Sequence, residues 1–219
     1  PLSACVKPSD RVALVVSDAA RLFPQEAVVR LVLEEISHVV PSHVTIVIAN
    51  GNHERSDPAR VGLGADLQAG YVIINHDSRD AASMRTVGHF PAKETFFFLK
   101  QALKHLTRSA RDVPVSLTKI ARAALSGDLK SAARLIGYTL FGRALFIFGA
   151  SLSARVRINR AVADADIRIL IGQIKPHFLA GFSGGYKAIF PGCACRTDIA
   201  MNHFMMNHPS VDLGRNNDN

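Results

Sequence analysis

The chain has 219 residues, 48% of them hydrophobic, and a formal net charge of +8. A chain of this length can bury one substantial core and leaves room for a small second unit. No apolar run reaches the ~20 residues of a membrane-spanning helix. The first residues lack the long apolar stretch of a signal peptide, so we expect none. The three cysteines are an odd, sparse set that fits no disulfide framework. These features predict a globular protein of the reducing cytoplasm.

The positive charge is concentrated in one segment. Residues 93–160 contain 13 Lys or Arg and 3 Asp or Glu, a balance of +10, so the rest of the chain carries −2. The overall charge therefore describes this one segment and is no argument that the rest of the chain binds nucleic acid. We predict no nucleic-acid partner.

Three apolar segments near the N-terminus predict buried strands over residues 11–17, 44–49 and 71–75. Helical periodicity follows the first of them over residues 25–40, and a short helix is expected over residues 58–67. Strands that alternate with helices predict an α/β fold with a mostly parallel, doubly wound (Rossmann-like) sheet.

Each of these predicted strands is followed by polar residues. They are Asp18 and Arg21 after the first, His53 after the second, and His76 with Asp77 after the third. Any one of them alone is typical of a turn or of the surface. Parallel strands bring such ends to one edge of the sheet, where ligands of open α/β sheets bind, so the repetition indicates a site.

Residues 92–152 differ from the rest of the chain, because basic residues interleave with Leu, Ile, Phe and Ala at helical spacing. We expect two or three amphipathic helices that form a basic helical insertion within a single α/β domain over residues 1–219. Two interpretations stay open: the insertion presents a solvated basic face, or it contacts a membrane or an acidic partner.

A fourth strand is expected over residues 165–171, and a glycine-rich turn follows it. The turn contains Ser183, Gly184 and Gly185, and Lys187 comes directly afterwards, a combination that suits an anion. Its spacing fits neither the Gly-x4-Gly-Lys-Ser/Thr phosphate loop nor the dinucleotide-binding fingerprint.

His53 and His177 suggest acid–base chemistry, since two neutral imidazoles across one cleft can donate and accept protons near neutral pH. A racemase or epimerase needs such a two-sided arrangement. Arg21 could bind a substrate carboxylate in bidentate fashion, with Asp18 orienting it. Lys187 could contact a phosphate or, with a lowered pKa, act as a nucleophile.

Two further groups raise the question of a metal. His203 and His208 lie five residues apart, so on a helix they would not share a face, and at most one of them would bind a metal. Cys193 and Cys195 are more typical of small buried thiols than of a soft-metal pair.

Several of these motifs together resemble the nickel-dependent lactate racemase family, in particular its N-terminal domain. The resemblance covers residues 10–90 and 155–212. It depends on Asp18-x-x-Arg21-x-x-Pro24, Ala49-Asn-Gly-Asn-His53, Asn75-His76-Asp77, Pro176-His177-x-x-Ala-Gly-Phe-Ser-Gly-Gly-x-Lys187, Pro191-Gly192 and Asn202-His203. The Pro-His to Lys block is long and specific, and the shorter motifs occur in the family's order.

The resemblance implies a nickel pincer nucleotide, the pyridinium-3-thioamide-5-thiocarboxylate mononucleotide, as the cofactor. In this family a lysine tethers the cofactor through a thioamide and a histidine binds its nickel. The matching residues here are Lys187 as the tether and His203 as the nickel ligand, and the cofactor phosphate would contact Ser183, Gly184 and Gly185.

The implied activity is that of an isomerase, a racemase or epimerase of a lactate-like 2-hydroxy acid that works by proton-coupled hydride transfer. His53 and His177 would then exchange the hydroxyl proton, and Arg21 with Asp18 would hold the substrate. The implied partners are cofactor-maturation enzymes and a C-terminal domain that this sequence lacks. We therefore expect residues 1–219 to be a truncated N-terminal catalytic domain.

Two alternatives come from other classes of function. One is a metal-assisted hydrolase that uses the histidines around zinc, although no carboxylate stands at a convincing spacing. The other is a non-catalytic fragment whose basic helices dock to a membrane or an acidic partner.

Overall fold

The computed structural model describes residues 1–21, 23–91 and 155–204, together with isolated residues between 95 and 130. Contacts divide the chain into two compact units, one of Pro1–Gly88 with Arg155–Asn219 and one of His89–Ala154. The helices expected over residues 92–152 fall almost entirely outside the described residues. The organisation of the chain as one domain with an insertion therefore stays a prediction, and the fold below is that of the first unit.

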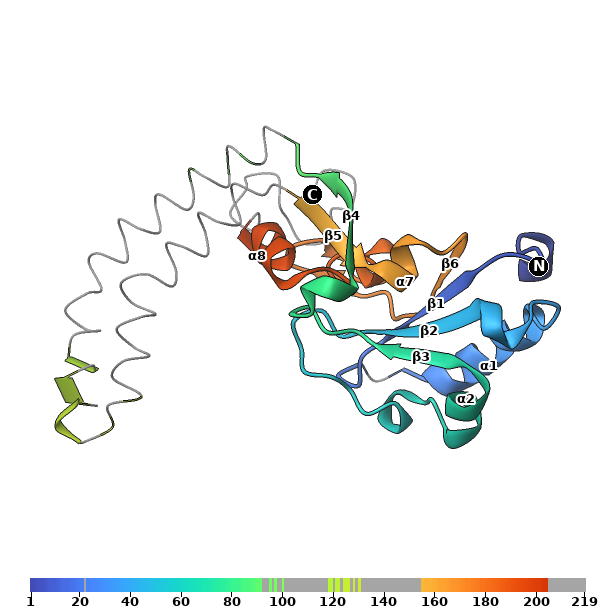
Figure 1. The fold of residues 1–219 in the computed structure, drawn as a ribbon, viewed down its shortest axis with the longest axis horizontal. Helices are drawn as coiled ribbons and strands as arrows, with labels where there is room; N and C mark the ends of the chain where they lie inside the picture. Colours follow the sequence, from blue (N-terminus) through green and yellow to red (C-terminus); the bar gives the residue numbers. More distant parts are fainter. Residues whose placement is uncertain are drawn as a thin grey trace. The chain divides into compact units, whose positions relative to one another are not determined.

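A parallel four-stranded sheet forms the centre of this unit (Figure 1). Its strands are β1 (Val12–Ser17), β2 (Val44–Ala49), β3 (Val72–Asn75) and β6 (Ile167–Leu170), in the order β3-β2-β1-β6. All three neighbouring pairs are parallel. The predicted α/β fold is confirmed, and each strand lies inside the segment from which it was predicted.

Side chains of β1 alternate between two hydrophobic cores. Leu14 and Val16 belong to one core together with residues of α1 (Gln25–Glu35) and α2 (Ala65–Gly70), and Val15 belongs to the other. The second core includes residues of α7 (Arg160–Ala163) and α8 (Arg196–Phe204). Because successive residues of a strand point to opposite faces, a strand buried on both faces reads as a continuous apolar run. The sheet is therefore covered on both sides, as a doubly wound fold requires.

Both predicted helices differ from the observed ones. The helix expected over residues 25–40 ends at Glu35. The apolar pattern of the sequence extends past the helix because Ile36 and Val39, in the turn that follows, are also buried. The helix expected over residues 58–67 is interrupted at Gly62, which has φ +79°. A Cβ at Gly62 would lie 2.9 Å from the Glu26 nitrogen, so only glycine allows this close approach.

Short elements complete the unit. The 3-10 turns are η1 (Leu2–Ala4), η2 (Pro41–His43), η3 (Ala59–Val61), η4 (Ala81–Ser83) and η6 (Gly185–Ala188). Two small sheets pair β4 (Met84–His89) with β5 (Arg155–Asn159), and β7 (Pro176–His177) with β8 (Gly181–Phe182). The three cysteines are free, and no helix in the described part of the chain is long and apolar enough to cross a membrane.

An ion pair between Arg157 and Asp198 attaches α8 to β5. The Asp198 side chain is fully buried and accepts hydrogen bonds from the Arg157 backbone nitrogen at 2.8 Å, from Nε at 3.1 Å and from a terminal guanidinium nitrogen at 2.6 Å. Such a charge-assisted pair fixes orientation as well as distance. It matters for the site because α8 carries His203.

Replacing Asp198 by Ala should therefore destabilise the protein by about 3 kcal/mol, since the change leaves the partly buried Arg157 without its partner. Urea unfolding followed by circular dichroism measures this loss. Asp66→Ala is the matched control, because Asp66 forms an exposed pair with Arg30, and its loss should be much smaller. Equal losses in the two variants would contradict this role of Asp198.

Candidate functional site

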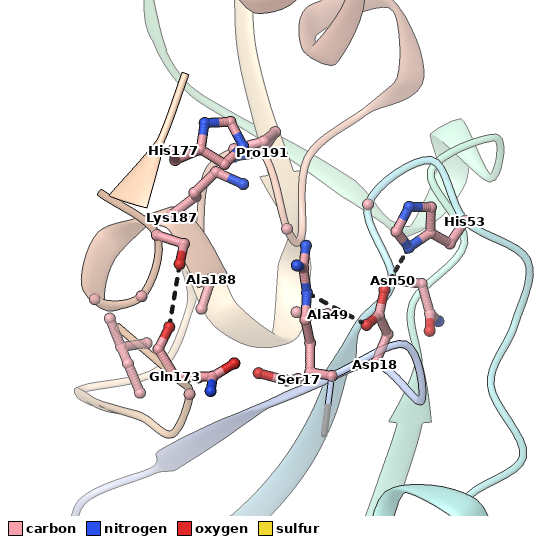
Figure 2. A pocket seen from close by; sticks show the side chains of 18 of the residues that line it. Ser17, Asp18, Ala49, Asn50, His53, Gln173, His177, Lys187, Ala188 and Pro191 are labelled. Atoms are coloured by element: carbon pink, nitrogen blue, oxygen red, sulfur yellow. Dashed lines mark hydrogen bonds and ion pairs between the residues drawn. The ribbon is translucent and has the colours of Figure 1, made fainter. Parts of the chain in front are cut away.

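One pocket lies at the carboxyl edge of the sheet, where β1, β2 and β6 end (Figure 2). Its volume of about 280 Å³ is close to the lower end of small-molecule sites, roughly 300 to 1,000 Å³. The structure brings nine of the residues that the sequence suggested for the site to this one pocket: Asp18, Arg21, His53, His177, Ser183, Gly184, Gly185, Lys187 and His203. His76 and Asp77, which were suggested by the same pattern of strand ends, do not line it. Their roles stay predictions, but their proximity does not depend on the family resemblance.

Asp18 and His53 form a hydrogen-bonded pair on the side of the pocket built from β1 and β2. The Asp18 carboxylate, which follows β1 directly and is 6% exposed, bonds to Nδ1 of His53 through Oδ2. Its other oxygen accepts a hydrogen bond from the Ala20 nitrogen at 3.2 Å and lies 3.8 Å from Nε of Arg21. Both oxygens of Asp18 are thus occupied by groups of the protein itself, which suits the orientation of His53 better than a direct contact with substrate.

His177 lies on the opposite side of the pocket, in the β7–β8 hairpin (Figure 2). Its Nδ1 accepts hydrogen bonds from the backbone nitrogens of Leu179 at 3.1 Å and Ala180 at 3.2 Å. The ring stacks on Phe178 with centroids 4.8 Å apart. Burial lowers the pKa of His177 below its usual value, and the surrounding positive charges, first among them Lys187, lower it further.

The glycine-rich turn is held in a fixed conformation. Gly184 has φ +90°, and a Cβ there would lie 3.0 Å from Cγ1 of Ile174 and 3.1 Å from the Gln173 carbonyl oxygen. The Ser183 hydroxyl bonds to the backbone oxygens of Gln173 and Lys175, each at 3.2 Å. Ser183 therefore closes the turn, and its contact with a cofactor phosphate stays a prediction.

Lys187 is half-buried in η6, immediately after that turn. Its pKa is lowered, first by burial and then by the charges of Arg21 and Lys175, while Asp18 acts in the opposite direction. Three cations thus face the pocket near a single carboxylate that His53 already engages. This balance favours an anionic ligand.

His203 occupies the last turn of α8 and lines the same pocket. Burial lowers its pKa, and the charge of Lys187 adds to that effect, so the ring is neutral at physiological pH, as a metal ligand must be. Within the described residues no group of three His, Cys, Asp or Glu side chains could hold a metal ion. The other candidate ligand, His208, lies outside the described residues.

The two cysteines behave as buried thiols. Burial raises the pKa of Cys193 to about 12, and the Cys195 sulfur lies 3.5 Å from the Thr197 hydroxyl. A thiol with so high a pKa does not supply the thiolate that metals prefer. The structure therefore agrees with the interpretation of Cys193 and Cys195 as packing residues.

A buried polar network supports the pocket from behind, and the sequence did not reveal it. The Asn50 amide donates to Oδ1 of Asn75 at 2.7 Å and to the His76 carbonyl at 2.8 Å. The fully buried His76 ring bonds through Nε2 to the Ala194 carbonyl at 3.1 Å. His76 therefore does not line the pocket, although it follows β3 directly. Asn50 and Gln173 do line it. The signals for Asn50 in the sequence were its place directly after a strand and its position in the Ala49-Asn-Gly-Asn-His53 motif.

The parallel sheet and the electropositive, histidine-lined pocket at its carboxyl edge define an α/β protein with a site for a small anionic ligand. A sequence model described as the lactate racemase N-terminal domain matches residues 1–123 and 145–214. Because this match covers most of the chain, the protein belongs to the lactate racemase N-terminal domain family.

Similar proteins have the same family name. The chain is 25% identical over 195 residues to a lactate racemase from Thermoanaerobacterium thermosaccharolyticum, covering 88% of this chain and 32% of the relative. It is 24% identical over 208 residues to a lactate racemase from Lactiplantibacillus plantarum, covering 93% and 35%. The chain thus spans about a third of the length of these curated relatives.

Two solved structures have a similar fold. The lactate racemase apoprotein from T. thermosaccharolyticum has a TM-score of 0.59 and 23% identity, with 94% of this chain and 36% of that chain covered. A Thermotoga maritima protein has a TM-score of 0.61 and 16% identity, with 98% and 41% covered. Both confirm the fold.

Three histidines with lowered pKa values predict a loss of stability in acid. The pKa values of His76, His177 and His203 are all lowered in the folded protein from the usual 6.5. Below that pH the unfolded chain binds more protons than the folded one, so the free energy of unfolding should fall as the pH falls through 6.5. Urea unfolding at a series of pH values measures this slope.

The variant His76→Gln should make that slope shallower by up to about 1.4 kcal/mol per pH unit, because one titrating group is removed. His43→Gln is the matched control, because it makes the same exchange at an exposed position on η2. A slope that is the same in His76→Gln as in the unmodified protein would contradict this assignment.

Proposed function

We propose that the protein is an isomerase, a racemase or epimerase of a lactate-like 2-hydroxy acid. The observation that carries the proposal is the placement of His53 and His177 on opposite sides of one pocket that is rich in positive charge (Figure 2). A substrate carboxylate would pair with Arg21, whose terminal guanidinium nitrogens have no hydrogen-bond partner among the described residues. Its hydroxyl group would then lie between the histidines, which exchange the proton of that oxygen.

The pocket fits the nickel pincer nucleotide of this family. Lys187 suits a covalent tether because its lowered pKa favours the neutral, nucleophilic amine. The turn at Gly184 and Gly185, both at positive φ, would allow the backbone to approach the cofactor phosphate closely. A cofactor that carries its own sulfur donors needs only one further ligand, which His203 would supply. When bound, this group would accept a hydride from the α-carbon of the substrate and return it.

The whole activity requires more than the described residues. About two thirds of each curated relative lies outside the aligned part, so we propose that a C-terminal domain closes the pocket. Cofactor-maturation enzymes are the second implied partner. A metal-assisted hydrolase has no set of three ligands among the described residues. The other alternative, docking to a membrane or an acidic partner, involves residues 92–152, most of which lie outside the described residues.

Intact mass spectrometry tests the tether. Protein produced with the maturation enzymes should carry a covalent adduct of the mass of the nucleotide, and the adduct should be absent in Lys187→Ala. Lys175→Ala is the matched control, because Lys175 lines the same pocket and should keep the adduct. An adduct that persists in Lys187→Ala would contradict the assignment of the tether, and no adduct on the unmodified protein would contradict the cofactor.

Nickel analysis tests the ligand separately. His203→Ala should keep the adduct on Lys187 but lose most of its nickel, since the imidazole of His203 is the one protein ligand that the proposal gives to the metal. Plasma emission spectrometry of the desalted protein gives the nickel content. Full nickel occupancy in His203→Ala would show that another group binds the metal.

A further inference from the structure

One positive charge in the pocket has no role in the proposed function. Arg21 is assigned to the substrate carboxylate and Lys187 to the tether, whereas Lys175 lines the same pocket without a task. The Lys175 ammonium group has no ion-pair partner among the described residues, although exposed cations elsewhere in the unit do, as Arg11 has with Asp166. An unpaired cation that lines a pocket is available to an anionic ligand.

The backbone at Lys175 is fixed by Ser183 on the facing strand of the β7–β8 hairpin. The Lys175 nitrogen donates to Oγ of Ser183 at 3.2 Å, and the Lys175 carbonyl oxygen accepts from the Ser183 nitrogen at 2.7 Å. These bonds continue the pairing of Pro176 with Phe182 by one residue. Because residues two apart in an extended chain share a face, Lys175 stands on the same face of the hairpin as His177.

Lys175 and Arg21 act on the same part of the pocket. Burial is the main cause of the lowered pKa of His177 and of Lys187, and the charges of Arg21 and Lys175 lower both pKa values further. Coulombic interactions weaken with distance, so both cations lie near these two groups. The only carboxylate among the described lining residues is Asp18, which His53 and Arg21 already engage.

We propose that the pocket selects a 2-hydroxy acid with a second carboxylate, and that Lys175 binds this second carboxylate while Arg21 binds the one on the α-carbon. This inference rests on the proposed racemase function and deepens it, because it names the class of substrate. Malate is the simplest chiral acid of this class, since it is lactate with a carboxylate added to the methyl group.

A methyl group and a carboxylate have opposite effects beside Lys175. Lactate would leave the ammonium group without a partner when the pocket closes, and burying an unpaired charge is costly. The second carboxylate of malate forms a charge-assisted hydrogen bond with the same group. The value of kcat/KM should therefore favour malate over lactate by about 10- to 100-fold.

Substrate preference in cofactor-loaded, full-length protein tests the proposal. The value of kcat/KM is measured for one enantiomer of malate and one of lactate. Lys175→Met keeps a long apolar side chain but removes the charge, so it should abolish the preference for malate. Lys7→Met is the matched control, because Lys7 is exposed and does not line the pocket, and the ratio should stay as it was. A ratio that Lys175→Met leaves unchanged, or a preference of the unmodified protein for lactate, would overturn the proposal.

Binding of inert acids gives a second readout that does not depend on turnover. Succinate and propanoate are malate and lactate without the hydroxyl group, so neither can react. Titration calorimetry of the loaded protein should give a Kd for succinate about 10- to 100-fold below that for propanoate. Lys175→Met should remove this difference. Equal affinities for the two acids in the unmodified protein would overturn the proposal.

The phosphate of the cofactor is the other anion within the same site. If Lys175 binds that phosphate instead, Lys175→Met lowers the yield of the covalent adduct and leaves both preferences unchanged, and the inference is wrong. The two proposals also fail separately. If loaded protein racemises neither acid but prefers succinate through Lys175, only the racemase function is wrong. If it racemises lactate and shows no preference for a second carboxylate, only the further inference is wrong.

Discussion

The parallel pairing of β1 with β2 and β6 is the constraint on which the site depends. The register sets Ser17 opposite Ala49 and Val15 opposite Leu170, so β1, β2 and β6 all end at the same edge of the sheet. Asp18, Asn50 and the segment after β6 therefore meet there, although they are far apart in sequence. A shift of one residue in this pairing would move each side chain of a strand to the opposite face of the sheet. The two separate cores, one on each face, disfavour such a shift because each is packed with its own set of side chains.

Charge at that edge is arranged around one buried carboxylate. Asp18 lies between His53 and Arg21, while Lys187 and Lys175 complete a surface that favours anions. Burial and mutual repulsion keep Lys187 and His177 closer to neutrality than they would be in water. Neutral bases beside fixed cations are what a site needs if it is to bind a carboxylate and move a proton at pH 7.

The sequence predicted the strands well because a strand buried on both faces is a continuous apolar run, as residues 44–49 illustrate. It brought Asp18, Arg21 and His53 together as candidates, and their shared pocket agrees with that, because polar side chains follow the ends of those strands. It could not predict the end of α1, since Ile36 stays buried after the helix stops. It could not predict the contacts of His76 with Ala194, or of Leu179 with the His177 ring, because each depends on the backbone path of a turn.

As a racemase, the protein that we propose would invert the α-carbon of a 2-hydroxy acid and retain the hydrogen on that carbon. Incubating cofactor-loaded, full-length protein with one enantiomer of lactate in deuterium oxide tests it directly. We expect the other enantiomer to accumulate with no deuterium on the α-carbon, because in the proposed reaction the hydrogen moves as a hydride and the histidines exchange only the hydroxyl proton. Racemisation with deuterium on the α-carbon, or no racemisation at all, would contradict it.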